Sequence, residues 1–176
     1  MCVLIYKPKG ADLPNIEILN ACHERNPHGS GFVTSKGVMF KTLNFKHFLY
    51  TLSNQVKKED EAIIHFRLAT HGSICKANCH PFKNGDIYFA HNGVLNVIPY
   101  YNKTDSETAF IKYFLPIIRK HGVHSRQLAS IVNSVIGYSK FAFMQDGKVR
   151  LFGRFMNING IYYSNTLWQT NKKIYA

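Results

Sequence analysis

The segment AIIHFRLATHG, residues 62–72, changes character along its length. Its apolar first part, Ala62–Leu68, predicts a buried strand. Arg67 lies at the end of that strand, and Thr70 and His71 follow on a loop. An arginine in this position can hold a carboxylate through two parallel hydrogen bonds. A surface arginine and an ordinary loop histidine would give the same local sequence, so the segment alone leaves its role open.

Upstream, the chain starts with MCVLIY, in which residues 2–6 predict another buried strand. Removal of Met1 would expose Cys2, because a small second residue permits that processing. Cys2 would then carry both a thiol and a free α-amine, whose pKa of about 7.7–8.0 suits a base near neutral pH. The thiolate is the nucleophilic form. The alternative is a structural cysteine at the start of a core strand.

Downstream, AHNGVLN (90–96) follows a predicted strand, Asp86–His91. An Asn92 amide beside the Gly93 N–H would form an oxyanion hole, a pair of donors that stabilises negative charge on a carbonyl oxygen. Asn-Gly is also a strong hairpin signal, so a simple turn is the competing interpretation.

The segment KTDSETAF (103–110) begins the strongest predicted helix, Asp105–Lys120. Asp105 or Ser106 would serve as its N-cap, with Glu107 in the first turn. The functional alternative has Asp105 facing a substrate ammonium group. Pro116 predicts a kink or break in this helix.

The remaining pattern predicts mainly strands, with helices between them. Asp12-Leu13-Pro14 opens one helix, Asn44 caps a second through about Asn54, and His124–Val135 forms another. Further strands are predicted at Phe32–Ser35, Val38–Lys41, Lys140–Met144, Val149–Phe152 and Ile161–Ser164. The class is α+β, and two sheets covered by helices or an ordinary α+β sandwich would both fit.

Composition sets the broader limits. The 176 residues are 45% hydrophobic and 18% charged, which indicates one globular domain over residues 1–176. No apolar run is long enough to cross a membrane and no secretory signal is present, so we expect a cytoplasmic protein. The formal charge of +12 raises the alternative of a catalytically silent module that binds nucleic acid, although the basic residues are scattered.

The loop after residue 70 contains further reactive side chains. Cys75 and Cys79 would be reduced in the cytosol, with a local disulfide as the alternative. Together with His71 and His80 they raise the alternative of a zinc site. Three residues separate the two cysteines, whereas zinc knuckles usually have two, and no second cysteine pair follows. We therefore expect no metal and no cofactor.

Taken together and in this order, these segments resemble the class II glutamine amidotransferase domain of the N-terminal-nucleophile hydrolase superfamily. That family starts with Met-Cys at the head of a strand and carries His-x-Arg-x-Ala-Thr-x-Gly, Asn-x-x-Pro, His-Asn-Gly and Asp-Thr/Ser-Glu. The matching residues here are His65, Arg67, Ala69, Thr70, Gly72, Asn78, Pro81, His91, Asn92, Gly93, Asn96, Asp105, Ser106 and Glu107. An upstream Arg-Gly-x-Asp-x-x-Gly segment is matched at Arg25 and Gly31, but Asn26 and His28 replace its glycine and aspartate.

The resemblance implies a four-layer αββα sandwich of two antiparallel sheets. It implies that Cys2 attacks the side-chain amide of glutamine and forms a thioester, with the oxyanion held by Asn92 and Gly93. Arg67 would bind the α-carboxylate and Asp105 the α-ammonium group, with Thr70 and His71 lining the pocket and Arg25 in a supporting role. The chain is most similar to short phage-type members, which would place it in a host cytoplasm. No segment typical of an acceptor domain is recognisable, so we expect ammonia to pass to a synthase on a separate protein. A plain glutaminase and an enzyme for a different amide are the alternatives.

Overall fold

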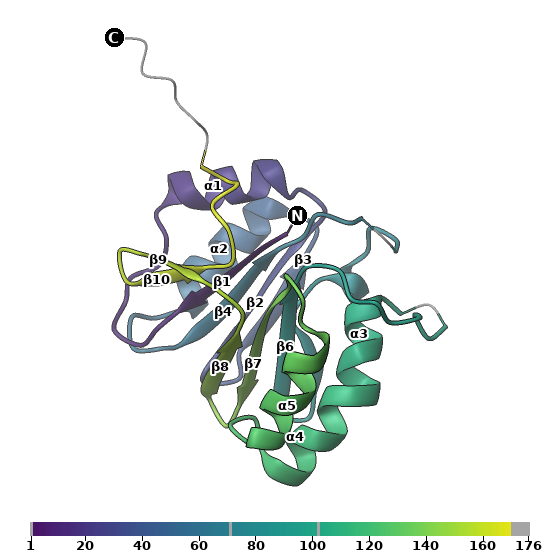
Figure 1. Ribbon diagram of the computed structural model, residues 1–176. Coiled ribbons are helices and arrows are strands. Elements are labelled where there is room, and N and C mark those ends of the chain that lie inside the picture. Colours follow the sequence, from purple (N-terminus) through teal and green to yellow (C-terminus); the bar gives the residue numbers. More distant parts are fainter. Residues whose placement is uncertain (1, 71, 102, 170–176) are drawn as a thin grey trace.

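The computed structural model describes residues 2–70, 72–101 and 103–169 and arranges them in four layers, helix, sheet, sheet, helix (Figure 1). One sheet has six strands in the order β3-β2-β4-β1-β10-β9, and the other has four in the order β5-β6-β7-β8. All paired strands are antiparallel. The α+β class and the αββα sandwich are therefore confirmed.

The six-stranded sheet places the N-terminal strand in its interior. Its strands are β1 (Val3–Lys7), β2 (Ser30–Thr34), β3 (Met39–Thr42), β4 (Ala62–Phe66), β9 (Met156–Ile158) and β10 (Ile161–Tyr163). β1 pairs with β4 on one side and with β10 on the other, so Ile5 lies between Ile64 and Tyr163. The predicted hairpin around Gly37 is present as β2 and β3.

The four-stranded sheet consists of β5 (Phe82–Asn84), β6 (Ile87–Asn92), β7 (Lys140–Gln145) and β8 (Lys148–Phe152). β7 and β8 are joined at Asp146 and Gly147, as the sequence predicts. Both of these residues have positive φ, 51° and 71°, which is the requirement of a two-residue turn of this kind. The short strands β5 and β9 were not predicted.

Two helices cover the six-stranded sheet and a second group covers the other (Figure 1). The first pair is α1 (Ile16–Arg25) and α2 (Phe45–Gln55); the second group is α3 (Asp105–Ala109), a π-helical turn η2 (Phe110–Phe114), α4 (Leu115–His121) and α5 (Arg126–Val135). A short 3-10 turn, η1 (Lys76–Asn78), lies in the loop after β4.

The helix starts follow capping chemistry, with two corrections to the predictions. Asn44 caps α2 as predicted, since its side chain accepts the His47 N–H. Asn15, not Asp12, caps α1. Thr104, not Asp105 or Ser106, caps α3 by accepting the Glu107 N–H at 3.1 Å. A side-chain oxygen must reach the N–H two or three residues ahead, and the actual helix start decides which residue is placed to do so.

Pro116 was predicted to kink or break the long helix. The structure has the π-helical turn η2 directly before it, and Pro116 occupies the first turn of α4. Proline lacks an N–H and is tolerated in a first turn, so the chain changes helix type at this point and continues.

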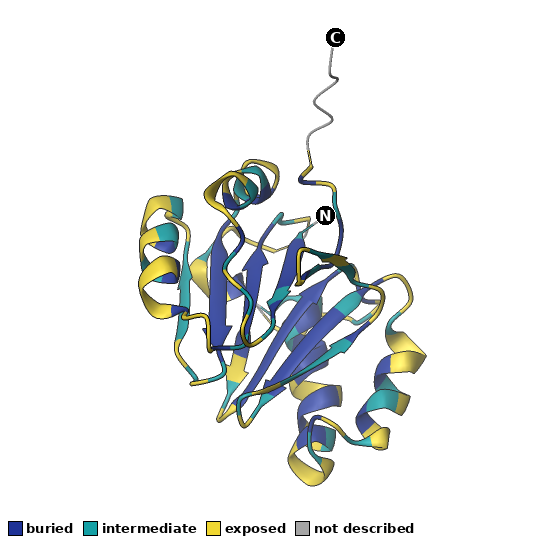
Figure 2. Cartoon of the chain, turned by 90° about the vertical axis from the view of Figure 1, so that its left-hand side faces the viewer, coloured by how far each residue is buried: buried dark blue, intermediate teal, exposed yellow. Residues whose placement is uncertain are grey.

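Three apolar cores separate the four layers, and strand alternation decides which residue enters which core (Figure 2). Val3 and Ile5 pack under α1 and α2, whereas Leu4 faces the other sheet. On β6, Phe89 packs under the second helix group, whereas Ala90 lies between the sheets. Even-numbered residues of both β1 and β6 therefore face the layer between the sheets.

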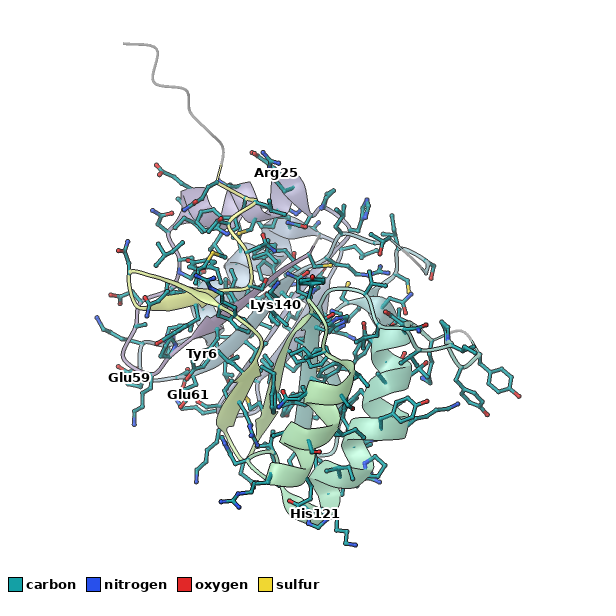
Figure 3. The ribbon with its side chains drawn as sticks, viewed as in Figure 1. Tyr6, Arg25, Glu59, Glu61, His121 and Lys140 are labelled. Atoms are coloured by element: carbon teal, nitrogen blue, oxygen red, sulfur yellow. The ribbon has the colours of Figure 1, made fainter. Side chains whose placement is uncertain are left out.

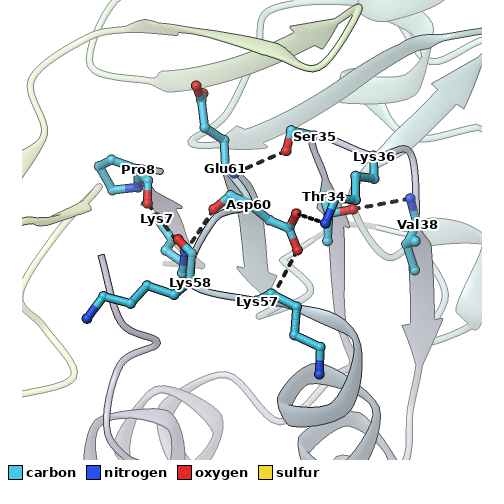
Figure 4. A network of polar contacts seen from close by, with 10 residues as sticks. All are labelled: Lys7, Pro8, Thr34, Ser35, Lys36, Val38, Lys57, Lys58, Asp60 and Glu61. Atoms are coloured by element: carbon cyan, nitrogen blue, oxygen red, sulfur yellow. Dashed lines mark hydrogen bonds and ion pairs between the residues drawn. The ribbon is translucent and has the colours of Figure 1, made fainter. Parts of the chain in front are cut away.

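A buried ammonium group secures the far end of β1 (Figure 4). Lys7 is fully buried, and its Nζ donates to the backbone oxygens of Pro8, Lys58 and Asp60 at 3.3, 3.0 and 2.8 Å. Asp60, also buried, accepts the Lys57 N–H at 2.9 Å and pairs with Lys36 at 2.9 Å. These bonds tie the turn before β4 to the end of β1.

Within the described residues, no helix is both long enough and apolar enough to span a membrane. Cys75 and Cys79 are free thiols, so the alternative of a local disulfide is not what the structure has. In the described part of the chain, no three His, Cys, Asp or Glu side chains gather as metal ligands; His71 lies outside that part.

Candidate active site

The site lies at the open end of the layer between the sheets, where β1 begins and β6 ends. By the same alternation that places Leu4 and Ala90 in this layer, Cys2 and Asn92 face it from opposite sheets. Arg67 also faces this layer, because it follows Ile63 and His65 at two-residue spacing. Three segments far apart in sequence thus bring a thiol, an amide and a guanidinium group together.

A cavity at this end, here called the Cys2 cavity, is lined by most of the predicted site residues. They are Cys2, Arg67, Thr70, Gly93 and Asp105. Asn92 is buried next to Gly93 and is not itself among the lining residues. His71 lies outside the described residues. Arg25 does not line the cavity: it is exposed and projects outward from the end of α1 (Figure 3). The structure therefore gives Arg25 no contact with this site.

The Cys2 thiol is held against the end of β4. The Leu68 N–H donates to Cys2 Sγ at 3.2 Å. Burial raises the pKa of the thiol, and the Leu68 hydrogen bond and the nearby charge of Arg67 act in the opposite direction. Because the net shift is upward, the thiol is protonated at neutral pH and needs a base to become a nucleophile.

Gly93 has a backbone that only glycine adopts easily, with φ at 149°. A Cβ atom there would collide with the Ser139 hydroxyl and would lie 2.8 Å from Ser139 Cβ and 2.9 Å from His91 Nε2. Both observations explain why glycine follows Asn92. The sequence interpretation as a simple hairpin turn is wrong, because β6 pairs with β5 and β7 and the chain after Gly93 runs toward α3.

Asn92 is buried, and its Nδ2 donates to Ser164 Oγ at 2.8 Å. An amide nitrogen carries two N–H donors, so one remains after this bond. Asn92 Oδ1 is buried and has no hydrogen-bond partner. Ser164 follows β10 and was not singled out by sequence reasoning.

Arg67 and Asp105 lie on different segments that line the same cavity. Arg67 is only 5% exposed, and its Nη1 donates to the backbone oxygen of Ser73 at 2.9 Å. Asp105 accepts the Leu95 N–H at 2.9 Å and the Ser106 N–H at 2.7 Å. These bonds fix one cationic and one anionic group at the walls of the cavity.

Three buried histidines, His65, His80 and His91, lie around the site. The sequence predicted no catalytic or substrate-binding role for them: His65 and His91 are motif matches, and His80 entered only in the zinc alternative. His65 Nε2 lies 3.1 Å from both the His91 backbone oxygen and His80 Nδ1. His91 Nδ1 lies 2.7 Å from Ser106 Oγ. Burial lowers the pKa of His65 to about 3 and that of His91 to about 4, and it also lowers the pKa of His80. All three rings are therefore neutral at physiological pH and act as dipoles.

Comparison with known proteins decides the family. The model of the family described as glutamine amidotransferases class-II matches residues 51–151, more than half of the chain. The chain belongs to the class II glutamine amidotransferases. The matched range contains Arg67, Thr70, Asn92, Gly93 and Asp105 but not Cys2, which the structure places in the same cavity.

The fold of this class II amidotransferase is similar to a solved structure of glutamine phosphoribosylpyrophosphate amidotransferase from B. subtilis, complexed with ADP and GMP. The TM-score is 0.60 at 17% sequence identity, over 93% of this chain and 41% of that one. At this identity the likeness concerns the fold. The chain spans less than half the length of that relative. No curated protein sequence matches the chain.

Proposed function

We propose that this chain hydrolyses the side-chain amide of glutamine to glutamate and ammonia, with Cys2 as the nucleophile once Met1 has been removed. The observation that carries the proposal is the single cavity in which Cys2, Gly93, Arg67 and Asp105 meet. Membership of the class II glutamine amidotransferases supports glutamine as the substrate. It gives no support to the alternative of a silent module that binds nucleic acid.

The proposed chemistry starts with a proton transfer. The free α-amine of Cys2 takes the thiol proton, and the thiolate attacks the carboxamide carbon of glutamine. One N–H of Asn92 and the N–H of Gly93 stabilise the negative charge on the oxygen. The C–N bond then breaks, and ammonia leaves with the proton held by the α-ammonium group. Water hydrolyses the resulting thioester, releases glutamate and restores the thiol.

Recognition is proposed to act at the other end of the substrate. The Arg67 guanidinium binds the α-carboxylate and the Asp105 carboxylate binds the α-ammonium group, as their opposite charges favour. Thr70 lines the same cavity, and His71 is proposed beside it. Holding both ends of a small amino acid converts the attack into a step between positioned groups.

We propose further that the ammonia acceptor is a synthase on a separate protein and that the enzyme acts in the cytoplasm, of a host cell if the gene is phage-encoded. Isolated chain supplied with glutamine alone is then expected to release ammonia into solution.

The test compares wild type with Cys2→Ala. Intact mass first establishes that Met1 is absent from the wild type. Ammonia release from glutamine is expected to fall at least 1,000-fold in Cys2→Ala, an order of magnitude typical for loss of a nucleophile. Cys75→Ala, which removes a thiol outside the cavity, is expected to retain wild-type activity. Equal ammonia release from wild type and Cys2→Ala contradicts the proposal.

A further inference from the structure

The segment after β10 supports the site although it lies outside all the motifs and outside the matched range 51–151. Ser164 N–H donates to the Leu4 backbone oxygen at 2.8 Å, and Asn165 Nδ2 donates to the Cys2 backbone oxygen at 2.8 Å. Trp168 Nε1 donates to the Asn165 backbone oxygen at 3.0 Å and packs on Tyr163. The segment is therefore fastened to the core at one end and to the start of β1 at the other.

The hydroxyl of Ser164 joins the two sheets. It accepts the Leu4 N–H of β1 at 2.9 Å and the Nδ2 of Asn92, at the end of β6, at 2.8 Å. Ser164 and Asn92 are each only 2% exposed, so water does not substitute for these bonds. A serine hydroxyl can accept two hydrogen bonds. Here it accepts one from β1 and one from the end of β6, on the two sides of the layer between the sheets.

This bridge restricts the amide of Asn92. A side-chain amide can rotate, and Asn92 Oδ1 has no partner that would hold it. Among the described residues, the bond to Ser164 is the one hydrogen bond of the Asn92 side chain. This bond directs one N–H of the Asn92 amide toward Ser164 and thereby also determines the direction of the second N–H. It also fixes that direction relative to β1, the strand that Cys2 precedes.

We infer that Ser164 is a positioning residue of the oxyanion hole: it orients the Asn92 amide toward the oxygen of the substrate carbonyl that Cys2 attacks. The inference rests on the proposed function. Ser164 does not touch substrate; it acts through Asn92. Its effect therefore falls on the step in which negative charge develops and not on glutamine binding, which depends on Arg67 and Asp105.

The first experiment measures kcat and KM for glutamine in Ser164→Ala, Ser164→Thr and Ser30→Ala. Ser164→Ala is expected to lower kcat about 10-fold, a loss smaller than the 100- to 1,000-fold typical of removing an oxyanion donor itself. KM is expected to stay within about twofold, because the charged groups are unchanged. Ser164→Thr keeps the hydroxyl and is expected to recover most of the lost rate.

Ser30→Ala is the matched control. Ser30 lies on β2 of the same sheet and is equally buried, at 2% exposure, but its hydroxyl has no hydrogen-bond partner. It is expected to keep the wild-type kcat. If Ser30→Ala lowers kcat as much as Ser164→Ala does, the effect is general to buried serines of this sheet and the inference is overturned.

Two further measurements separate positioning from a disturbed β1. Alkylation of Cys2 by iodoacetamide, followed by peptide mass spectrometry, creates no oxyanion, so its rate is expected to be equal in wild type and Ser164→Ala. In an Asn92→Ala background, Ser164→Ala is expected to cause no further loss of kcat, because two residues acting as one unit are not additive. Slower alkylation, or the same fold-loss in both backgrounds, overturns the inference.

The outcomes also separate this inference from the proposed function. Wild type that releases no ammonia from glutamine contradicts the proposed function. Wild type that releases ammonia through Cys2, with Ser164→Ala equally active, contradicts the role of Ser164 alone.

Discussion

The buried polar groups at the two ends of β1 differ in how completely they are hydrogen-bonded. At the far end, the Lys7 ammonium group donates to three backbone oxygens and Asp60 is paired with Lys36 (Figure 4). At the near end, Asn92 Oδ1 and ring nitrogens of His65, His80 and His91 are buried without hydrogen-bond partners. Buried polar atoms are normally paired, and each exception calls for an explanation.

We interpret this difference as a division between groups that stabilise the fold and groups that serve the proposed reaction. Hydrogen-bonded groups at the Lys7 end hold the chain together, whereas incompletely hydrogen-bonded groups at the Cys2 end leave hydrogen-bonding capacity next to the proposed nucleophile. Substitutions at the two ends should therefore have opposite signatures: loss of stability with normal catalysis at one end, and loss of catalysis with normal stability at the other.

Among substitutions that keep Cys2 in place, Asn92→Ala is expected to have the largest effect. Loss of one oxyanion donor should lower kcat about 100- to 1,000-fold. The midpoint of urea unfolding should change little, because the lost side chain already leaves one buried atom unpaired. Steady-state kinetics and urea titration on the same sample check both. A kcat within threefold of wild type contradicts the role of Asn92.

Arg67→Ala is expected to raise the KM for glutamine about 10- to 100-fold, since hydrogen bonds to charged groups contribute about 1.5–3 kcal/mol. The carboxyl-blocked analogue glutamine α-amide provides the matched control, because it lacks the carboxylate. Wild type should use this analogue poorly, and Arg67→Ala should lose little further with it. An unchanged KM for glutamine contradicts the carboxylate clamp.

At the other end of β1, Lys7→Met should lower the free energy of unfolding by about 2–4 kcal/mol, because three backbone oxygens lose their donor. The kcat of the folded fraction should not change. Lys9→Met, two residues further on and exposed, serves as the control and should be neutral. Urea titration measures the effect, and equal stabilities of the two variants would refute the role given to Lys7.

The smallest expected effect is on the pH dependence of the urea midpoint. The folded-state pKa values of His65 and His91, about 3 and 4, lie below the ordinary 6.5. The unfolded chain therefore binds more protons than the folded chain between about pH 4 and 6.5. The stabilisation is complete above pH 6.5 and is lost as pH falls through this window. The urea midpoint should be lower at pH 5 than at pH 7, with a shallower decline in His65→Gln; identical declines in the two proteins would argue against this cause.

Much of the fold follows from local signals in the sequence. The Asn44 cap, the turn at Asp146-Gly147 and the apolar run that begins at Ala62 are strong and short-range signals, and the structure agrees with each. β9 could not be found in this way: it has only three residues and is an edge strand that depends on pairing with β10. The choice of Thr104 over Asp105 as the cap depends on a helix start that periodicity does not fix to one residue.

The residues of the candidate site also include some that local sequence signals predicted and some that they did not. Cys2, Arg67, Gly93 and Asp105 were predicted because they belong to recognisable segments, and the structure brings them to one cavity. Arg25 was placed by a loose motif; it is exposed and does not line the cavity. Ser164 and the three histidines have hydrogen-bonding partners that are distant in sequence. Ser164 meets Asn92 across 72 positions, and no local pattern marks such a pair.

The pairing of β1 with β10 has a consequence for folding during synthesis on the ribosome. Ile5 pairs with Tyr163, and the Cys2 backbone oxygen bonds to Asn165. β1 is therefore synthesised long before its partner β10, and contacts this distant in sequence form slowly. Until then the start of the chain stays accessible to the removal of Met1 that we propose. In that proposal Cys2 acquires its free α-amine before the sheet around it is complete.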